Sequence, residues 1–193
     1  MVIDLSLTDK NFNTYEEFEE KQQQTDKILE YIDGIIYMSP SPSIKHQRIS
    51  SFLHGELHNS LKNSGCEVFS APTDVMFEQN ENNKNKNKRV VPDLFVTCNP
   101  ENFTENEYVG APEFIIEILS PSNKSHDLVR KLNLYMEHGV KEYWIVDPME
   151  KRIMIYTLDE NAEVQFDLVN ENEIATSRLF ENFKIETKNL FFD

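Results

Sequence analysis

Apolar and polar residues alternate along this chain with two different periods, and each period predicts one kind of element. Apolar side chains recur at helical spacing over about 43–65 and again over about 125–138, and a glycine stands at the end of each stretch. Thr14 and Glu17 have the spacing of a capping box, which predicts a short helix over about 14–23. The pattern therefore predicts three helices.

Asp33 and Gly34 separate two short apolar runs, over 28–32 and 35–38. An Asp-Gly pair tolerates the positive φ angles that tight hairpin turns require. The pattern predicts an N-terminal β-hairpin.

Short runs rich in β-branched and aromatic residues predict further strands at 68–69, 75–77, 90–96, 114–119 and 142–147, and a closing hairpin at 152–158 and 164–169. Strand, helix and strand follow one another over 113–147, which is typical of a parallel pair with its crossover helix, whereas hairpins need antiparallel neighbours. We therefore expect an α/β (α+β) fold with a central mixed sheet flanked by helices. The stretch 174–193 has no clear pattern.

Composition narrows the class of protein. A chain of 193 residues suffices for one domain, so we expect a single domain over 1–193. The net charge of −15 argues against avid non-specific binding of nucleic acid. No apolar stretch approaches the roughly 18 residues of a membrane helix, and the N-terminus has no signal-peptide pattern, so a cytoplasmic protein without membrane contact is expected.

Cys66 and Cys98 are far apart and outside any CxxC pair, so we expect two reduced structural thiols.

Glu117 is the most informative residue, because it interrupts the apolar run over 114–119. Burying an unpaired ionised carboxylate costs several kcal/mol or more, so a cation, a metal or a proton must offset it. The structural alternative is a strand-end carboxylate paired with Lys or Arg. Asp93 interrupts a similar run over 90–96, directly after Pro92, and prolines in strands mark edges, strand starts or bulges.

Two such acids on neighbouring strands suggest a divalent cation between them. Mg²⁺ prefers carboxylate oxygens and keeps several waters, one of which can become a nucleophile. Lys131, on the helix after the strand of Glu117, is a candidate for orienting that water. The alternative for Lys131 is a surface ion pair with Asp127, four residues earlier. His46 could face the same cleft, although a capping or core histidine is the simpler interpretation.

Several segments together resemble one known family: 31–34 (YIDG), 91–94 (VPDL), 111–122 (APEFIIEILSPS) and 142–148 (EYWIVDP). The combination is similar to the Uma-two family of restriction endonucleases, in the PD-(D/E)XK nuclease superfamily, over about 28–158. The resemblance implies a restriction-endonuclease-like core with Asp93 and Glu117 as ligands of Mg²⁺, with Mn²⁺ as a substitute. The superfamily lysine is replaced here by Leu119, so the resemblance implies that Lys131 supplies the amine and that the Ile118 carbonyl adds a metal ligand.

The implied activity is metal-assisted hydrolysis of phosphodiester bonds in DNA, with Asp93, Glu117 and Lys131 as the catalytic residues. The segment 81–89 contains Lys84, Lys86, Lys88 and Arg89 against Glu81, a local positive excess that could contact a DNA backbone. The remaining surface is acidic, so we expect weak or recruited DNA binding.

Two alternatives stay open from the sequence. One is a catalytically idle nuclease fold that serves as a binding or assembly module, including a homodimer, in which an internal Lys or Arg would neutralise Glu117. The other is a metal-dependent hydrolase of a small phosphate ester, which would use the same acids in a closed pocket.

Overall fold

The computed structural model describes residues 12–39, 41–77, 87–120 and 125–191, with the side chains of the last segment from residue 129 onward. Its helices are α1 (Tyr15–Gln23), α2 (Ile44–Ser60), α3 (Ser125–Glu137) and α4 (Thr187–Leu190), with a 3-10 turn, η2, at Pro100–Asn102. Within these segments no helix is long and apolar enough to cross a membrane.

The strands form two mixed sheets and a small third one. The five-stranded sheet has the order β2-β1-β5-β4-β7, with β2 at Ile35–Met38, β1 at Leu29–Ile32, β5 at Lys88–Val90, β4 at Asp74–Phe77 and β7 at Glu107–Val109. The six-stranded sheet has the order β11-β10-β9-β8-β6-β3, with β11 at Val164–Val169, β10 at Arg152–Leu158, β9 at Glu142–Asp147, β8 at Phe114–Ile118, β6 at Leu94–Thr97 and β3 at Glu67–Ser70. In these two sheets only β4–β7 and β8–β9 are parallel pairs among the described strands.

Local sequence signals explain the elements that were predicted. Asp33 and Gly34 turn the β1–β2 hairpin with φ angles of 50° and 81°, in the region that favours glycine. Thr14 and Glu17 form the expected capping box of α1. The helix, strand and hairpin positions over 125–169 agree with the prediction, and so does the parallel pairing of β8 with β9. The predicted mixed α+β class is confirmed.

The predicted single strand over 90–96 is wrong, because the run divides between the two sheets. Val90 ends β5 in the five-stranded sheet, and Leu94 begins β6 in the six-stranded sheet. Pro92 lies between them and has no N–H to donate to a ladder. The chain therefore leaves one sheet and enters the other, which places Asp93 at their junction.

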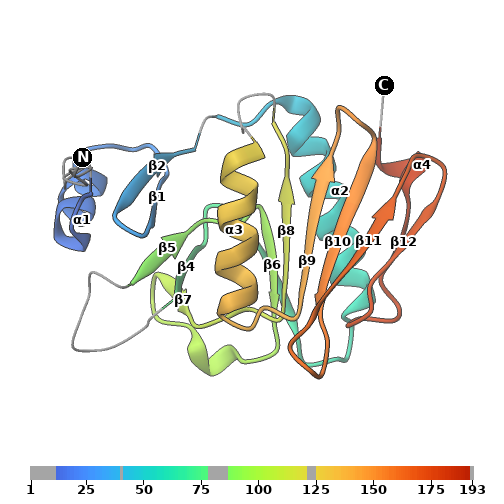
Figure 1. The fold of residues 1–193 in the computed structure, drawn as a ribbon. Coiled ribbons are helices and arrows are strands. Elements are labelled where there is room, and N and C mark those ends of the chain that lie inside the picture. Colours follow the sequence, from blue (N-terminus) through green and yellow to red (C-terminus); the bar gives the residue numbers. More distant parts are fainter. Residues whose placement is uncertain (1–11, 40, 78–86, 121–124, 192–193) are drawn as a thin grey trace, which may run out of the picture.

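Two helices cover opposite faces of the six-stranded sheet (Figure 1). On one face, Leu53 of α2 packs in a cluster with Ile116 and Trp144. On the other face, Tyr135 of α3 packs in a cluster with Ile115. Since side chains alternate along a strand, neighbouring residues of β8 point to different helices.

The unassigned stretch 174–193 contributes to the α2 face. It contains the small antiparallel sheet of β12 (Ile174–Thr176) and β13 (Lys184–Glu186), followed by α4. Phe183, Ile185 and Leu190 belong to the same core cluster as α2. These elements are short and contain few apolar residues at a regular period, so their sequence alone did not reveal them.

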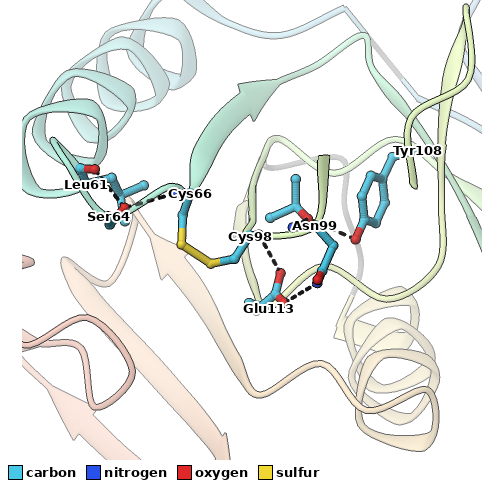
Figure 2. The surroundings of a disulfide bond; sticks show 8 residues. Leu61, Ser64, Cys66, Cys98, Asn99, Tyr108 and Glu113 are labelled. Atoms are coloured by element: carbon cyan, nitrogen blue, oxygen red, sulfur yellow. Dashed lines mark hydrogen bonds between the residues drawn. A yellow bond between two sulfur atoms is a disulfide. The ribbon is translucent and has the colours of Figure 1, made fainter. Parts of the chain in front are cut away.

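The expectation of two reduced thiols is wrong, because Cys66 and Cys98 form a disulfide bond (Figure 2). β3 and β6 pair antiparallel, with Glu67 opposite Thr97. Cys66 directly precedes Glu67 and Cys98 directly follows Thr97, so the two cysteines lie opposite each other. Their Cα atoms are 4.0 Å apart. The Cys98 backbone N–H also donates to Glu113 Oε2 over 2.9 Å. The two cysteines are 32 residues apart in the sequence, and the pairing of β3 with β6 brings their sulfur atoms together.

Candidate functional site

A cavity of about 600 Å³ is lined by residues of both large sheets and of α2 and α3. The three residues proposed from the sequence, Asp93, Glu117 and Lys131, all line it. Glu30 from the N-terminal hairpin and His46 from α2 line it as well. The structure thus gathers ionisable groups from five separate parts of the chain around one pocket.

Strand register places the two sequence-predicted acids side by side. β6 runs antiparallel to β8 with Leu94 opposite Ile116, so Asp93, directly before β6, lies next to Glu117. The Ile118 backbone N–H donates a hydrogen bond of 2.8 Å to Asp93 Oδ2. This bond fixes one acid to the strand that carries the other.

Glu117 is buried, with 7% of its surface exposed. Its Oε1 atom accepts hydrogen bonds from Lys131 Nζ at 2.9 Å and from the Tyr135 hydroxyl at 2.8 Å. Burial raises the pKa of Glu117, Lys131 lowers it, and the charges of Asp93 and Glu30 raise it again, with a net pKa of about 7. Glu117 therefore keeps its proton to a higher pH than an exposed glutamate does.

Asp93 is held by His46, the histidine at the start of α2. His46 Nε2 lies 3.1 Å from Asp93 Oδ2. Burial lowers the pKa of His46, but the hydrogen bond and charge of Asp93 outweigh it, so the net pKa is raised. His46 Nδ1 is buried without a hydrogen-bond partner in the described part of the chain. The imidazole thus acts on Asp93 through a single ring nitrogen.

Lys131 bridges two carboxylates. Its Nζ atom lies 2.9 Å from Glu117 Oε1 and 2.8 Å from Glu30 Oε1. Burial lowers the pKa of Lys131, but the two carboxylates outweigh burial and raise it. The side chain of Asp127, the alternative partner proposed from the sequence, lies outside the described residues. The described contacts direct Lys131 into the acidic pocket.

Glu30 is a pocket residue that the sequence reasoning missed. It lies in β1, is 5% exposed, and accepts a 2.8 Å hydrogen bond from the Val91 backbone N–H in addition to Lys131. The signal that identified Glu117 was present here too, because Glu30 interrupts an apolar strand over 28–32. The sequence analysis assigned that stretch to a strand of the hairpin and did not predict its carboxylate as a site residue.

The donor set of the pocket fits a hard divalent cation. Asp93 Oδ1 and Glu117 Oε2 accept no hydrogen bond from any residue described, whereas the other oxygen of each is engaged. Nowhere in the described segments do three His, Cys, Asp or Glu side chains form a ready metal cluster. Mg²⁺ is usually held by one or two carboxylates together with waters, so two acids with a free oxygen each suit it.

The basic segment near residue 88 does not form the expected positive surface, as far as it is described. Lys88 is buried, and its Nζ atom lies 3.4 Å from Asp33 Oδ1. Arg89 forms ion pairs with Asp74 and Glu107. Each described cation is thus matched by a carboxylate. Lys84, Lys86 and Glu81 lie outside the described residues.

Comparison with solved structures defines the class of fold. A crystal structure of a putative nuclease from Anabaena variabilis superposes with a TM-score of 0.70 and 23% identity, covering 86% of this chain and 91% of that chain. At this identity the match concerns the fold, a mixed α+β architecture.

Sequence comparison then gives the family. Residues 13–188 match the Uma2 family, described as "Putative restriction endonuclease". The uncharacterized protein slr1290 of Synechocystis sp. is 28% identical over 159 residues, which cover 82% of this chain and 73% of that protein. The chain belongs to the Uma2 family of restriction-endonuclease-like proteins, as its sequence motifs predicted.

Proposed function

We propose that this protein is a metal-dependent endonuclease that hydrolyses phosphodiester bonds in DNA. The observation that carries the proposal is the pairing of Asp93 with Glu117 in one pocket, where each carboxylate keeps an oxygen that accepts no hydrogen bond from the described residues. Family membership and the nuclease-like fold support the reaction class.

Asp93 and Glu117 would hold Mg²⁺ through these free oxygens, with the Ile118 carbonyl as a further ligand. When bound, the cation would supply Lewis-acid activation of a water molecule and of a phosphoryl oxygen. His46 fixes Asp93, and Tyr135 fixes Glu117, so that neither carboxylate has to be ordered during the reaction.

Lys131 would act on the reacting groups from helix α3, beside Glu117. Two of its three ammonium donors are directed to Glu30 and Glu117, which leaves one for the attacking water or for a phosphoryl oxygen. The water oxygen forms a bond to phosphorus, and the bond from phosphorus to the leaving sugar oxygen breaks. The attacking water loses one proton to solvent, and the sugar oxygen takes up one proton from solvent. Lys131 offsets the negative charge that develops on the phosphoryl group.

DNA affinity should be low without a metal or a recruiting partner. The chain has a net charge of −15, and Lys88 and Arg89 are neutralised by carboxylates. Long-range attraction to the phosphate backbone is therefore weak.

A plasmid-cleavage assay with Mg²⁺ tests the proposal. Asp93→Asn and Glu117→Gln should each abolish the conversion of supercoiled plasmid to nicked or linear forms. Glu56→Gln is the matched control, because Glu56 is an exposed acid of α2 that does not line the pocket. Equal cleavage by all four proteins would assign the activity to a contaminant.

A second candidate function is favoured by the ion pairs of Lys131. Lys131 contacts Glu117 and Glu30 within the chain, as expected of an idle nuclease fold that only binds or assembles. Calorimetric titration with Mn²⁺ separates the two. An active site should give binding heat that Asp93→Asn and Glu117→Gln remove, whereas the idle module should give none that depends on these residues.

A further inference from the structure

Arg130 differs from the adjacent Lys131 in its partners. Both residues line the pocket, but Lys131 contacts two carboxylates. In the described parts of the chain, Arg130 forms no ion pair; its contacts are a hydrogen bond to the Tyr37 hydroxyl and a position over the Tyr37 ring, 5.8 Å from its centroid. Among the residues that the structure describes, this guanidinium therefore has no carboxylate partner, although three acids line the same pocket.

The Arg130–Tyr37 contact leaves donors available for a ligand. Arg130 donates to the Tyr37 oxygen, and this direction leaves the hydroxyl hydrogen of Tyr37 free to donate elsewhere. The guanidinium retains further N–H groups, in a planar fork that matches two oxygens of a phosphate group. The ring of Tyr37 holds the guanidinium by a cation–π contact. Together the two side chains present several donors and no acceptor other than the one already used.

The pair lies in a more open part of the pocket wall than the two glutamates do. Arg130 and Tyr37 are half-buried, and Met38, which also lines the pocket, is 57% exposed. Glu117 and Glu30 are almost fully buried. An anion that reaches the pocket can therefore meet the guanidinium while its other atoms remain in solvent.

We propose that Arg130 and Tyr37 form a phosphate-binding subsite, which holds a phosphodiester group of a nucleic-acid strand beside the acid pair. The inference rests on the proposed function, because the acid pair is taken as the place of hydrolysis. The subsite also explains how a chain of charge −15 holds an anionic polymer: one positioned guanidinium supplies local attraction where the overall field repels.

A binding assay without metal tests the subsite separately from cleavage. Fluorescence anisotropy of a labelled DNA oligonucleotide, titrated with protein in EDTA at low ionic strength, gives the affinity and its salt dependence. Arg130→Gln should weaken binding about fivefold or more and reduce the slope of log affinity against log salt by about one. Arg48→Gln removes the same charge from an exposed position of α2 that does not line the pocket, and should change affinity less than twofold.

Tyr37→Phe keeps the ring beneath the guanidinium and removes only the hydroxyl, so it should weaken binding about two- to fivefold without unfolding the protein. An unchanged affinity in Arg130→Gln, an equal loss in Arg48→Gln, or no detectable binding by wild type would overturn the subsite. Competition by bis(p-nitrophenyl) phosphate as strong as that by unlabelled oligonucleotide would overturn the nucleic-acid strand in favour of a small phosphodiester at the same donors.

Failure of the proposed function gives a different result. In that case Asp93→Asn and Glu117→Gln cleave plasmid as well as wild type does. The binding assay in EDTA does not depend on cleavage, so Arg130→Gln and Tyr37→Phe would still bind the oligonucleotide more weakly than wild type.

Discussion

Two buried glutamates on adjacent parallel strands have opposite surroundings. Glu117 of β8 faces the α3 side of the sheet, where a lysine and a phenol share one of its oxygens and the other oxygen is free of described partners. Glu142 of β9 is fully buried on the α2 side. Its Oε1 accepts from Trp144 Nε1 at 2.6 Å, and its Oε2 accepts from the Ser177 hydroxyl at 2.9 Å and the Arg178 and Leu179 backbone N–H groups at 3.0 and 2.8 Å.

The difference shows what separates a structural carboxylate from a candidate catalytic one. Glu142 is surrounded by neutral donors that join β9 to the C-terminal segment, so its bonding capacity is used within the fold. Glu117 shares its lysine with Glu30 and lies beside Asp93, and the described residues leave its Oε2 atom without a hydrogen bond. Burial alone does not distinguish the two.

The largest expected effect is on catalysis, from Glu117→Gln. The amide keeps an oxygen for Lys131 and Tyr135 but removes the charge that a divalent cation requires, so Mg²⁺-dependent cleavage should fall about 100-fold or more. The free energy of unfolding should change by about 1 kcal/mol or less, since both hydrogen bonds can persist. Plasmid cleavage and urea unfolding measure the two quantities. Retained cleavage would place Glu117 with Glu142 among the structural acids.

Glu142→Ala should have the reverse profile. It leaves the Trp144 N–H, the Ser177 hydroxyl and two backbone N–H groups without their acceptor, and each buried unsatisfied group costs about 1–3 kcal/mol. We expect the free energy of unfolding to fall by about 4 kcal/mol or more, with cleavage per folded molecule unchanged. Urea titration, with activity measured well below the unfolding midpoint, checks both. A specific loss of cleavage at full folding would contradict the structural role.

The pH dependence of stability sharpens the assignment of Glu142. Burial raises the pKa of Glu142 above its usual 4.5, although hydrogen bonds from Leu179, Trp144, Ser177 and Arg178 oppose the shift. The folded state therefore binds this proton more tightly than the unfolded state does. The contribution is present below about pH 4.5 and is lost as the pH rises through the folded pKa.

Glu142→Gln should lack this contribution, so the unfolding free energy of the wild type minus that of the variant should increase as the pH falls from 8 towards 4.5. Urea unfolding at several pH values from 4.5 to 8 measures that difference. A difference independent of pH would show that the four donors fully offset burial.

The smallest expected effect comes from Tyr135→Phe, which removes the phenol that fixes Glu117. The lost hydrogen bond to a carboxylate should cost about 1–2 kcal/mol of unfolding free energy. Tyr143→Phe is the matched control, because the Tyr143 hydroxyl is buried without a hydrogen-bond partner in the described part of the chain. The Tyr135 and Tyr143 rings also pack together, with their centroids 4.9 Å apart. Thermal unfolding of both variants should show a loss only for Tyr135→Phe; equal losses would mean that ring packing alone is being measured.

The sequence identified part of the site and missed part of it for a common reason. Glu117 and Asp93 interrupt apolar strands, and this local conflict is visible in the sequence. Glu142 opens an equally apolar strand and Glu30 interrupts another, so the same signal does not say which carboxylate has donors waiting for it. Lys131 was found because a helix directly follows β8, whereas its second partner, Glu30, lies 101 residues away.

The sequence by itself determined the local elements: the Asp-Gly hairpin, the capped helices, the β8–α3–β9 crossover and the family motifs, because turn chemistry and periodicity act over a few residues. Tertiary structure alone decided the division of 90–96 between two sheets, the Cys66–Cys98 bond, the four donors around Glu142, and the meeting of Glu30, His46 and Arg130 in the pocket of the acid pair. These contacts join segments far apart in the chain, and their geometry depends on which strands pair and in which register.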